Sequence, residues 1–197
     1  MDFEFYKQHL KNKLSKKRFE HCVNVANCAA ELAKIYGENE EKASVAGLLH
    51  DVTKELSDDE HIEILKDSGI SFENFPPKLF HSISGSEYIK QKLGITDEGI
   101  RTAIRYHTTG RENMTLLEKI VFVADYVSPE RKWPDIKELY ELAKSDIDRV
   151  ALCKLVVAVY NCLKRGQTVH FDTLAACRQI IYQKRDELNS EFFRKIK

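Results

Sequence analysis

The spacing of its apolar residues is the feature that most constrains the fold of this chain of 197 residues. In most segments these residues recur at intervals of three and four, which is the pattern of amphipathic helices. Phe19, Val23 and Ala26 begin one such series, and Gly37 is expected to end it. The same spacing predicts further helices from near Glu38 to Asp51, from Ser57 or Asp58 to Gly69, from His81 to Leu93, from Glu98 to Tyr106, from Thr115 through Val127, over about 146–165 and over about 172–188.

Two segments depart from simple helical spacing. The stretch from Phe72 to Phe80 contains Pro76-Pro77 and is predicted to be an ordered loop. The run from Val156 to Tyr160 is apolar enough for a buried strand, but its flanks keep helical spacing and favour a helix. No internal repeat, low-complexity tract or shift in composition divides the chain. The sequence therefore predicts an all-α fold in which residues 1–197 form a single compact domain.

The composition excludes several classes of protein. Hydrophobic residues make up 43% of the chain and charged residues 31%, which are ordinary shares for a folded globular protein. Because 31 basic residues balance 31 acidic ones, no net charge attracts the protein to nucleic acid or to an anionic membrane. An anionic substrate would therefore require a local basic cluster or a metal.

The cysteines and the first residues of the chain indicate the cellular compartment in which the protein is expected. The five cysteines form no CxxC pair, and the chain opens with charged residues instead of the apolar stretch of a signal peptide. No apolar run is long enough to span a bilayer. These features predict a cytoplasmic protein whose cysteines are buried as small apolar side chains.

Two aspartates stand in apolar surroundings, where a carboxylate is unfavourable without a compensating cation. The pair His50-Asp51 follows the apolar turn 46–49, with Lys54 one turn further on. Asp125 interrupts the apolar run 120–127, which belongs to the most apolar helix of the chain. A solvated helix end is an alternative for His50-Asp51, whereas Asp125 needs a cation or strong donors.

Three further histidines each have an ordinary explanation when taken alone. His21 lies beside the apolar face of its helix, His81 begins a helix, and His107 ends one, where the helix dipole favours it. With His50 and the two aspartates they form a set of imidazole and carboxylate ligands without thiolate, which suits iron, manganese or zinc. Four histidines and two aspartates exceed the needs of one catalytic metal but suffice for two if one carboxylate bridges.

The order of these residues resembles that of the HD-domain superfamily of metal phosphohydrolases. The resemblance is closer to one branch, the symmetrical bis(5′-nucleosyl)-tetraphosphatases of the YqeK type. It covers residues 18–131 and extends more weakly towards the C-terminus. The segments that carry it are Arg18-Phe-Glu-His21, Ala46-Gly-Leu-Leu-His-Asp-Val-Thr-Lys54, Ile104-Arg-Tyr-His-Thr-Thr-Gly110, Leu117-Glu-Lys-Ile-Val-Phe-Val-Ala-Asp-Tyr-Val-Ser-Pro-Glu-Arg131 and His170-Phe-Asp-Thr-Leu-Ala175. Ser82, Phe171 and Cys177 depart from the pattern, since glycine, proline and arginine are usual there.

The resemblance implies a pair of metal ions, iron in this family, that share Asp51. One ion would take His21, His50, Asp51 and Asp125, and the other would take His81, His107 and a bridging oxygen of Asp51. A hydroxide bridging the two ions would attack an inner phosphorus of a bis(5′-nucleosyl) tetraphosphate. Diadenosine tetraphosphate would then yield two molecules of ADP.

The resemblance also implies a basic and polar shell around these metals. Asp51, Lys54 and Arg131 are the predicted catalytic residues. The C-terminal helices are expected to complete the nucleotide site. The predicted nucleotide-binding residues are Arg18, Lys54, Thr108, Arg131, His170 and Thr173.

Other functions stay open at this point. An HD-type nucleotidase or phosphodiesterase acting on another nucleotide would share the metal residues. A catalytically silent module would bind nucleotide without turnover, and a plain helical interaction protein would bind no metal. The loop around Trp133, or the last helix with Phe192-Phe193, could form the surface of a homodimer.

Overall fold

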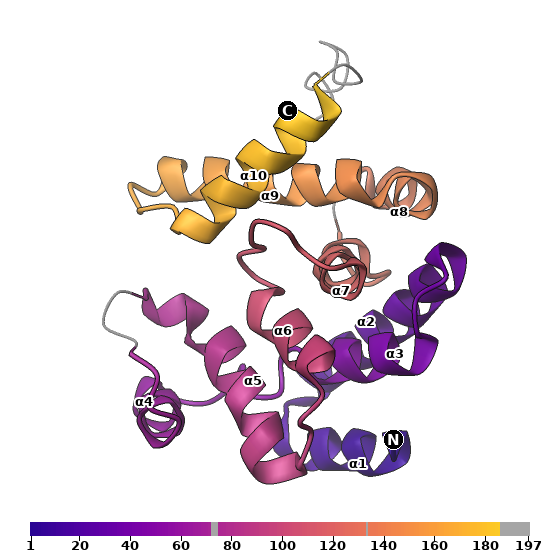
Figure 1. Cartoon of the computed structure of the whole chain (residues 1–197). Coiled ribbons are helices and arrows are strands. Elements are labelled where there is room, and N and C mark those ends of the chain that lie inside the picture. Colours follow the sequence, from indigo (N-terminus) through magenta and orange to yellow (C-terminus); the bar gives the residue numbers. More distant parts are fainter. Residues whose placement is uncertain (72–74, 133, 186–197) are drawn as a thin grey trace.

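The computed structural model describes residues 1–71, 75–132 and 134–185, and this part of the chain is helical and contains no β-strand (Figure 1). The prediction of an all-α fold is confirmed. Its elements are α1 (Phe3–Lys13), α2 (Lys16–Tyr36), α3 (Glu40–Leu49), α4 (Asp58–Asp67), the 3₁₀ turn η1 (Pro77–Leu79), α5 (Phe80–Leu93), α6 (Glu98–Tyr106), α7 (Leu116–Val127), α8 (Ile136–Ser145), α9 (Ile147–Lys164) and α10 (Phe171–Lys184).

Local signals in the sequence set several helix ends. Ser57 begins α4 with a capping box, in which its hydroxyl accepts from the backbone of Glu60 while the Glu60 carboxylate accepts from the backbone of Ser57. Thr115 and Glu118 do the same at the start of α7. Gly37 ends α2 with a left-handed φ of 71°, which a glycine adopts without strain. The predicted ends of these three helices are therefore confirmed.

Other parts of the chain differ from the expectation or lie outside the described residues. The apolar spacing did not predict the helices α1 and α8. In the predicted loop from Phe72 to Phe80, residues Pro77–Leu79 form the 3₁₀ turn η1. The segment Val156 to Tyr160 lies within α9, as its flanks indicate. Trp133, Phe192 and Phe193 lie outside the described residues, so the expected homodimer surface stays a prediction.

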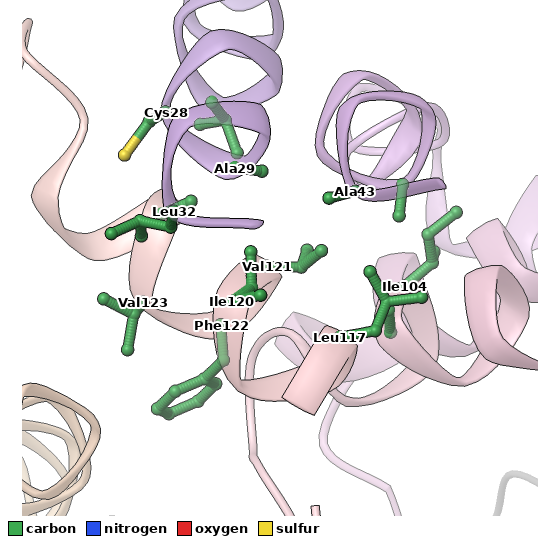
Figure 2. Close-up of a cluster of buried hydrophobic side chains, with 14 of the residues drawn as sticks. Cys28, Ala29, Leu32, Ala43, Ile104, Leu117, Ile120, Val121, Phe122 and Val123 are labelled. Carbon is green, nitrogen blue, oxygen red and sulfur yellow. The ribbon is translucent and has the colours of Figure 1, made fainter. Parts of the chain in front are cut away.

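The core is built around α7, whose residues 120–124 are all apolar and buried. Ile120 and Val121 of α7 pack towards α2 and α3, and Leu117 meets Ile104 of α6 (Figure 2). Phe122 points to the other side of α7, where α9 covers it (Figures 1 and 2). An apolar stretch as continuous as 120–127 can be buried only in this way, between two groups of helices.

The helices are therefore arranged in two groups on either side of α7. In Figure 1, α8, α9 and α10 lie across the top, whereas α1 to α6 lie below or beside it. None of the described helices combines the length and the apolar character needed to cross a membrane. In the group formed by α1 to α6, the C-terminal end of α3, the N-terminal end of α5 and the C-terminal end of α6 are directed towards α7. These three helix ends lie close together.

The contact between α2 and α3 depends on Gly47. A Cβ atom at this position would lie 3.0 Å from Ala26 Cα and 3.0 Å from the Val25 carbonyl oxygen, both of them backbone atoms that cannot turn away. Gly47 therefore permits the close approach of the two helices. Its carbonyl also accepts a hydrogen bond of 2.7 Å from His50 Nδ1, so the same residue orients a candidate metal ligand.

We expect Gly47→Ala to destabilise the protein by about 1–3 kcal/mol, because overpacking a closed helix contact forces the backbone apart. That loss corresponds to a decrease in Tm of about 2–12 °C for a chain of this size. Ser44→Ala, at a half-buried position of the same helix, is the matched control. Thermal unfolding followed by circular dichroism measures both, and an unchanged Tm for Gly47→Ala would contradict the close-contact interpretation.

Candidate metal centre

Five helices deliver the predicted metal ligands to one place. His21 lies in the middle of α2, His50-Asp51 follows α3, and His81 lies in the first turn of α5. His107 caps the end of α6, and Asp125 lies in the last turn of α7. The four histidines and Asp51 are buried, and the Asp125 side chain is only 16% exposed. The structure thus brings together all six predicted ligands from positions far apart in the sequence.

The ligand atoms fall into two groups that share Asp51. One atom each of His21, His50 and Asp51 lie within 4.8 Å of one another, and so do one atom each of Asp51, His81 and His107. Asp51 Oδ2 faces the first group, at 3.4 Å from His50 Nε2. Asp51 Oδ1 faces the second group, at 3.5 Å from His81 Nε2 and 3.6 Å from His107 Nε2.

Asp125 adds a second carboxylate to the first group. Its Oδ1 atom lies 3.2 Å from His21 Nε2 and 3.8 Å from His50 Nε2. Its carboxylate therefore lies beside the first group. This is the division of ligands that the sequence resemblance implies.

Two of the imidazoles are oriented by their own helices. His50 Nδ1 donates to the Gly47 carbonyl, and His107 Nδ1 donates to the Ile104 carbonyl, both over 2.7 Å. A neutral imidazole that donates from Nδ1 presents the lone pair of Nε2, which is the form that binds a metal. Both Nε2 atoms face Asp51.

Glu130 orients the imidazole of His21. Its carboxylate accepts a hydrogen bond from His21 Nδ1, and it also accepts from Asn24 Nδ2 at 2.9 Å and Ser128 Oγ at 2.8 Å. A carboxylate that holds the second nitrogen of a ligating histidine is a common arrangement around protein-bound metals. The sequence interpretation assigned no role to Glu130, although it directly precedes the predicted Arg131.

The two carboxyl groups of the centre carry negative charge. Burial raises the pKa of the Asp51 carboxyl, but the neighbouring His50 and His107 hold that pKa well below its usual range. Burial likewise raises the pKa of Asp125, and Lys154 with His21 lowers it well below the usual range. Both carboxyl groups are therefore ionised at neutral pH, at a place with little access to water.

The histidines of the second group are neutral. Burial, together with the neighbouring His107 and Lys54, holds the pKa of His81 well below its usual value. Burial also lowers the pKa of His107. Neutral imidazole is the form of histidine that ligates a metal.

Two buried atoms of the centre test whether a metal fits. Among the described residues, His50 Nε2 and Asp51 Oδ1 are buried and have no hydrogen-bond partner. Buried polar atoms are nearly always paired, so such atoms in a native site call for a further partner. Both are metal-ligating atom types, and each belongs to a group compact enough for one ion. The donor set therefore fits a divalent metal.

The three predicted cationic residues surround the carboxylates. Arg18 Nη1 donates to Asp51 Oδ2 at 2.7 Å, and Arg131 donates to Asp125 Oδ1. Lys54 Nζ lies 2.9 Å from His81 Nε2 and 4.0 Å from Asp51 Oδ1. Their side chains are 31%, 32% and 33% exposed for Arg18, Arg131 and Lys54, so each can reach both the centre and solvent.

Lys154 of α9 is a fourth cation at the centre, and the sequence interpretation did not select it. Its Nζ atom donates to Asp125 Oδ2 at 2.9 Å, to the Phe122 carbonyl at 2.7 Å and to the His107 carbonyl at 2.9 Å. With only 12% of its side chain exposed, Lys154 is committed to these partners. A lysine inside the apolar stretch of α9 was the available signal, as Asp125 was in α7.

The turn after α6 is held by the C-terminal helices. Thr173 Oγ1 of α10 donates to the Thr109 carbonyl at 2.9 Å, so this predicted nucleotide residue is engaged with the protein itself. Thr108 Oγ1 lies 3.0 Å from His107 Nε2 and 3.2 Å from His81 Nε2, and therefore faces the second ligand group. Gly110 closes the turn with a positive φ of 63°.

A cavity of about 310 Å³ adjoins the second ligand group. We call it the His170 cavity, after the residue whose ring stacks on Phe75 with centroids 5.2 Å apart. Lys54, His81 and Thr108 of the centre line it, together with Thr173 and His170. The structure therefore places His170 and Thr173 beside the centre, but in the wall of this cavity and not among the metal ligands.

The three departures from the family pattern are accommodated without disturbing the ligands. Ser82 is buried and its hydroxyl donates to the Leu79 carbonyl at 2.9 Å, which closes η1 next to His81. Phe171 is 70% exposed, while His170 still caps α10 through its Nδ1 atom. Cys177 is half-buried against the core, with no contact to the metal ligands among the described residues.

Comparison with known proteins identifies the family of this centre. The HD domain family matches residues 18–130, which include all six predicted ligands. The chain belongs to this family. A relative from Halalkalibacterium halodurans, named bis(5′-nucleosyl)-tetraphosphatase, symmetrical, is 35% identical over 90% of this chain and 96% of its own. A relative from Bacillus subtilis with the same name is 36% identical over 83% of this chain and 89% of its own.

A solved structure supports the same membership. This is an HD superfamily hydrolase from Clostridium acetobutylicum, described as predicted and as involved in NAD metabolism. It is 35% identical to this chain, with a TM-score of 0.89, and the match covers 93% of this chain and 99% of the other. Within the HD family, the chain therefore groups with the symmetrical bis(5′-nucleosyl)-tetraphosphatases, and the fold of an HD hydrolase extends over nearly its whole length.

We expect Asp51→Asn to abolish stoichiometric metal binding by this HD protein, because the amide cannot supply negative charge to either ligand group. The measurement is the metal-to-protein ratio by mass spectrometry after loading with Mn²⁺ and desalting. Asp59→Asn, at an exposed position of α4, is the matched control and should keep its metal. A full metal content in Asp51→Asn would show that Asp51 is not a shared ligand.

We expect Lys154→Met to lower the stability by about 2 kcal/mol, because Asp125 and two buried carbonyls lose a donor. This corresponds to a decrease in Tm of about 4–8 °C. The loss should be smaller with saturating Mn²⁺, since the ion also neutralises Asp125. Lys164→Met, at an exposed position of the same helix, is the control. An equal decrease with and without Mn²⁺ would show that Lys154 acts only through the packing of α9.

Proposed function

We propose that this protein hydrolyses bis(5′-nucleosyl) tetraphosphates and splits diadenosine tetraphosphate into two molecules of ADP. The observation that carries this proposal is the shared position of Asp51 between two compact ligand groups, beside a cavity of about 310 Å³ and among partly exposed cations. The names of the two relatives support the same substrate and the same symmetry of cleavage.

The proposed cofactor is a pair of divalent ions that share Asp51. His21, His50 and Asp125 would complete the ligands of one ion, and His81 and His107 would complete those of the other. The donors are imidazole nitrogens and carboxylate oxygens, which suit iron, manganese or zinc, and the sequence resemblance favours iron. When bound, such a pair of ions supplies a water of lowered pKa and neutralises charge on phosphate oxygens.

The proposed task of the protein cations is to hold the polyphosphate. Arg18, Lys54 and Arg131 contact the carboxylates and are each about one third exposed, so they can turn towards phosphate oxygens as substrate enters. Charge on these oxygens grows in the transition state of phosphoryl transfer, and fixed cations stabilise it. Thr108 Oγ1, which faces His81 and His107, can donate a further hydrogen bond to a phosphate oxygen.

The His170 cavity is the proposed site of one nucleoside. His170 lies in its wall, where its ring, stacked on Phe75 behind it, provides an aromatic surface for a base. Thr173 contributes by holding the turn of Thr108 and Thr109 in place, because its hydroxyl is already engaged with the Thr109 carbonyl. Of these two predicted nucleotide-binding residues, His170 would therefore contact the base directly, whereas Thr173 would position the turn of Thr108 and Thr109.

The proposed compartment is the cytoplasm. All five cysteines are unpaired in the described part of the chain, and Cys22, Cys28 and Cys153 are buried. Burial raises the pKa of Cys28 to about 12 and that of Cys153 to about 11, so these thiols are unreactive. Unpaired cysteines are typical of proteins from a reducing compartment.

The symmetry of cleavage is tested by the products. We expect metal-loaded protein to convert diadenosine tetraphosphate into ADP alone, measured by anion-exchange chromatography at early times. The combination of ATP and AMP would contradict attack at the central phosphates. Asp51→Asn serves as the control for contaminating hydrolases and should form neither set of products.

A panel of other nucleotides tests the two alternatives. Faster hydrolysis of a nucleoside monophosphate or a cyclic dinucleotide would favour a nucleotidase or phosphodiesterase. Full metal content with no hydrolysis of any nucleotide would favour a silent binding module. The complete ligand set in the structure argues for turnover.

A further inference from the structure

A second cavity lies on another side of the metal centre, between α2 and α8. It also measures about 310 Å³, and we call it the Tyr140 cavity. Val127, Ile136 and Tyr140 form much of its apolar wall, and Asn24, Asn27 and Glu31 supply polar groups. No residue of this cavity has a part in the function proposed above. Its size falls within the range of about 300–1,000 Å³ that small-molecule sites occupy.

The Tyr140 cavity is joined to the first ligand group by contacts between side chains. Asn24 lines the cavity, and its amide donates to Glu130 Oε2 at 2.9 Å. The same Glu130 carboxylate holds His21 Nδ1. Pro129 also lines the cavity, and Arg131, two residues later, donates to Asp125. The wall of the cavity is thus continuous with the side of the centre that carries His21 and Asp125.

The His170 cavity adjoins the centre from the other side. It reaches the second ligand group through Lys54, His81 and Thr108. In Figure 1, the elements around it, which are the start of α5, the end of α9 and the start of α10, lie on the left. The helices α2 and α8 around the Tyr140 cavity lie on the right. The two ligand groups therefore lie between two cavities of similar volume.

A symmetrical dinucleotide requires such an arrangement. If cleavage occurs at the middle of the tetraphosphate, the reacting phosphates lie at the metals and the two nucleosides extend from them in opposite directions. One cavity can hold only one of the two nucleosides. The cations are distributed accordingly: Lys54 lines the His170 cavity, whereas Arg131 contacts Asp125 and follows Pro129 of the Tyr140 cavity by two residues.

We propose that the Tyr140 cavity binds the second nucleoside of the substrate, which is an inference that rests on the function proposed above. The Tyr140 ring, whose hydroxyl is fixed by Glu31, provides a surface on which a base can stack. The amides of Asn24 and Asn27 can donate to and accept from a base edge. The Glu31 carboxylate can accept from a ribose hydroxyl or an exocyclic amine. The apolar side chains Val127 and Ile136 exclude water from the base.

The test compares two substrates that differ by one nucleoside. Metal-loaded protein is assayed with diadenosine tetraphosphate and with adenosine 5′-tetraphosphate, which has a nucleoside at one end only. We expect kcat/KM to be greater for the dinucleotide by about tenfold, since a base stacked on an aromatic ring contributes that much. Asn27→Phe should fill the cavity from an exposed position of α2, and Tyr140→Leu should remove the aromatic ring.

The ratio of the two kcat/KM values decides between the outcomes. Both variants should bring this ratio close to one, whereas Lys34→Phe, at an exposed position of α2 outside the cavity, should leave it unchanged. A ratio that stays unchanged in both cavity variants, or that is already one in the unsubstituted protein, overturns the proposal. If neither substrate is hydrolysed, the proposed function itself is overturned, and the inference with it.

Binding of the product gives a second readout that does not depend on turnover. Calorimetric titration of the metal-loaded protein with ADP should give two molecules per chain, and one molecule per chain in Asn27→Phe. A single ADP per chain in both proteins would overturn the proposal. Circular dichroism and metal content confirm that each variant is folded and loaded.

Discussion

The negative charge of Asp51 and Asp125 in a buried location is the constraint on which the rest of the site depends. Two ionised carboxylates with little access to water would destabilise the fold unless cations or strong donors surround them. The chain meets this requirement with Arg18 and Lys54 near Asp51, and with Arg131 and Lys154 on Asp125. The histidines that approach the same oxygens add imidazole nitrogens as further candidate metal ligands.

The C-terminal helices are part of this site although they follow the matched HD region, which ends at residue 130. Lys154 of α9 joins the end of α6 to α7 by contacting the His107 and Phe122 carbonyls and Asp125. Thr173 of α10 holds the neighbouring turn through the Thr109 carbonyl. Loss of α9 and α10 would therefore release the second ligand group as well as uncover the core around Phe122.

The sequence was sufficient to predict most of the helices, and to select six candidate ligands that the structure brings together, for identifiable physical reasons. Apolar spacing depends only on local geometry, and Asp125 was recognisable because a carboxylate in an apolar helix needs a partner. Glu130 and Lys154 were missed because their roles depend on which helices pack together. Lys154 lies in the same kind of apolar setting as Asp125, so one rule applied to both signs of charge would have selected it. The Tyr140 cavity could not be predicted, since its walls come from α2, α7 and α8.

The contacts of His50 and His107 with carbonyls three residues earlier have a consequence for how the site assembles. Each imidazole donates to a carbonyl in the last turn of its own helix, so its tautomer is chosen by local geometry before any distant contact forms. The negative ends of the dipoles of α3 and α6 then lie beside the ligands they deliver. Both candidate ligands are thus preorganised, and less conformational entropy would remain to be lost on binding an ion. Fraying of the last turn of either helix would restore the conformational freedom of its imidazole and would speed release of an ion. Retention of metal is therefore expected to depend on the local stability of these two helix ends.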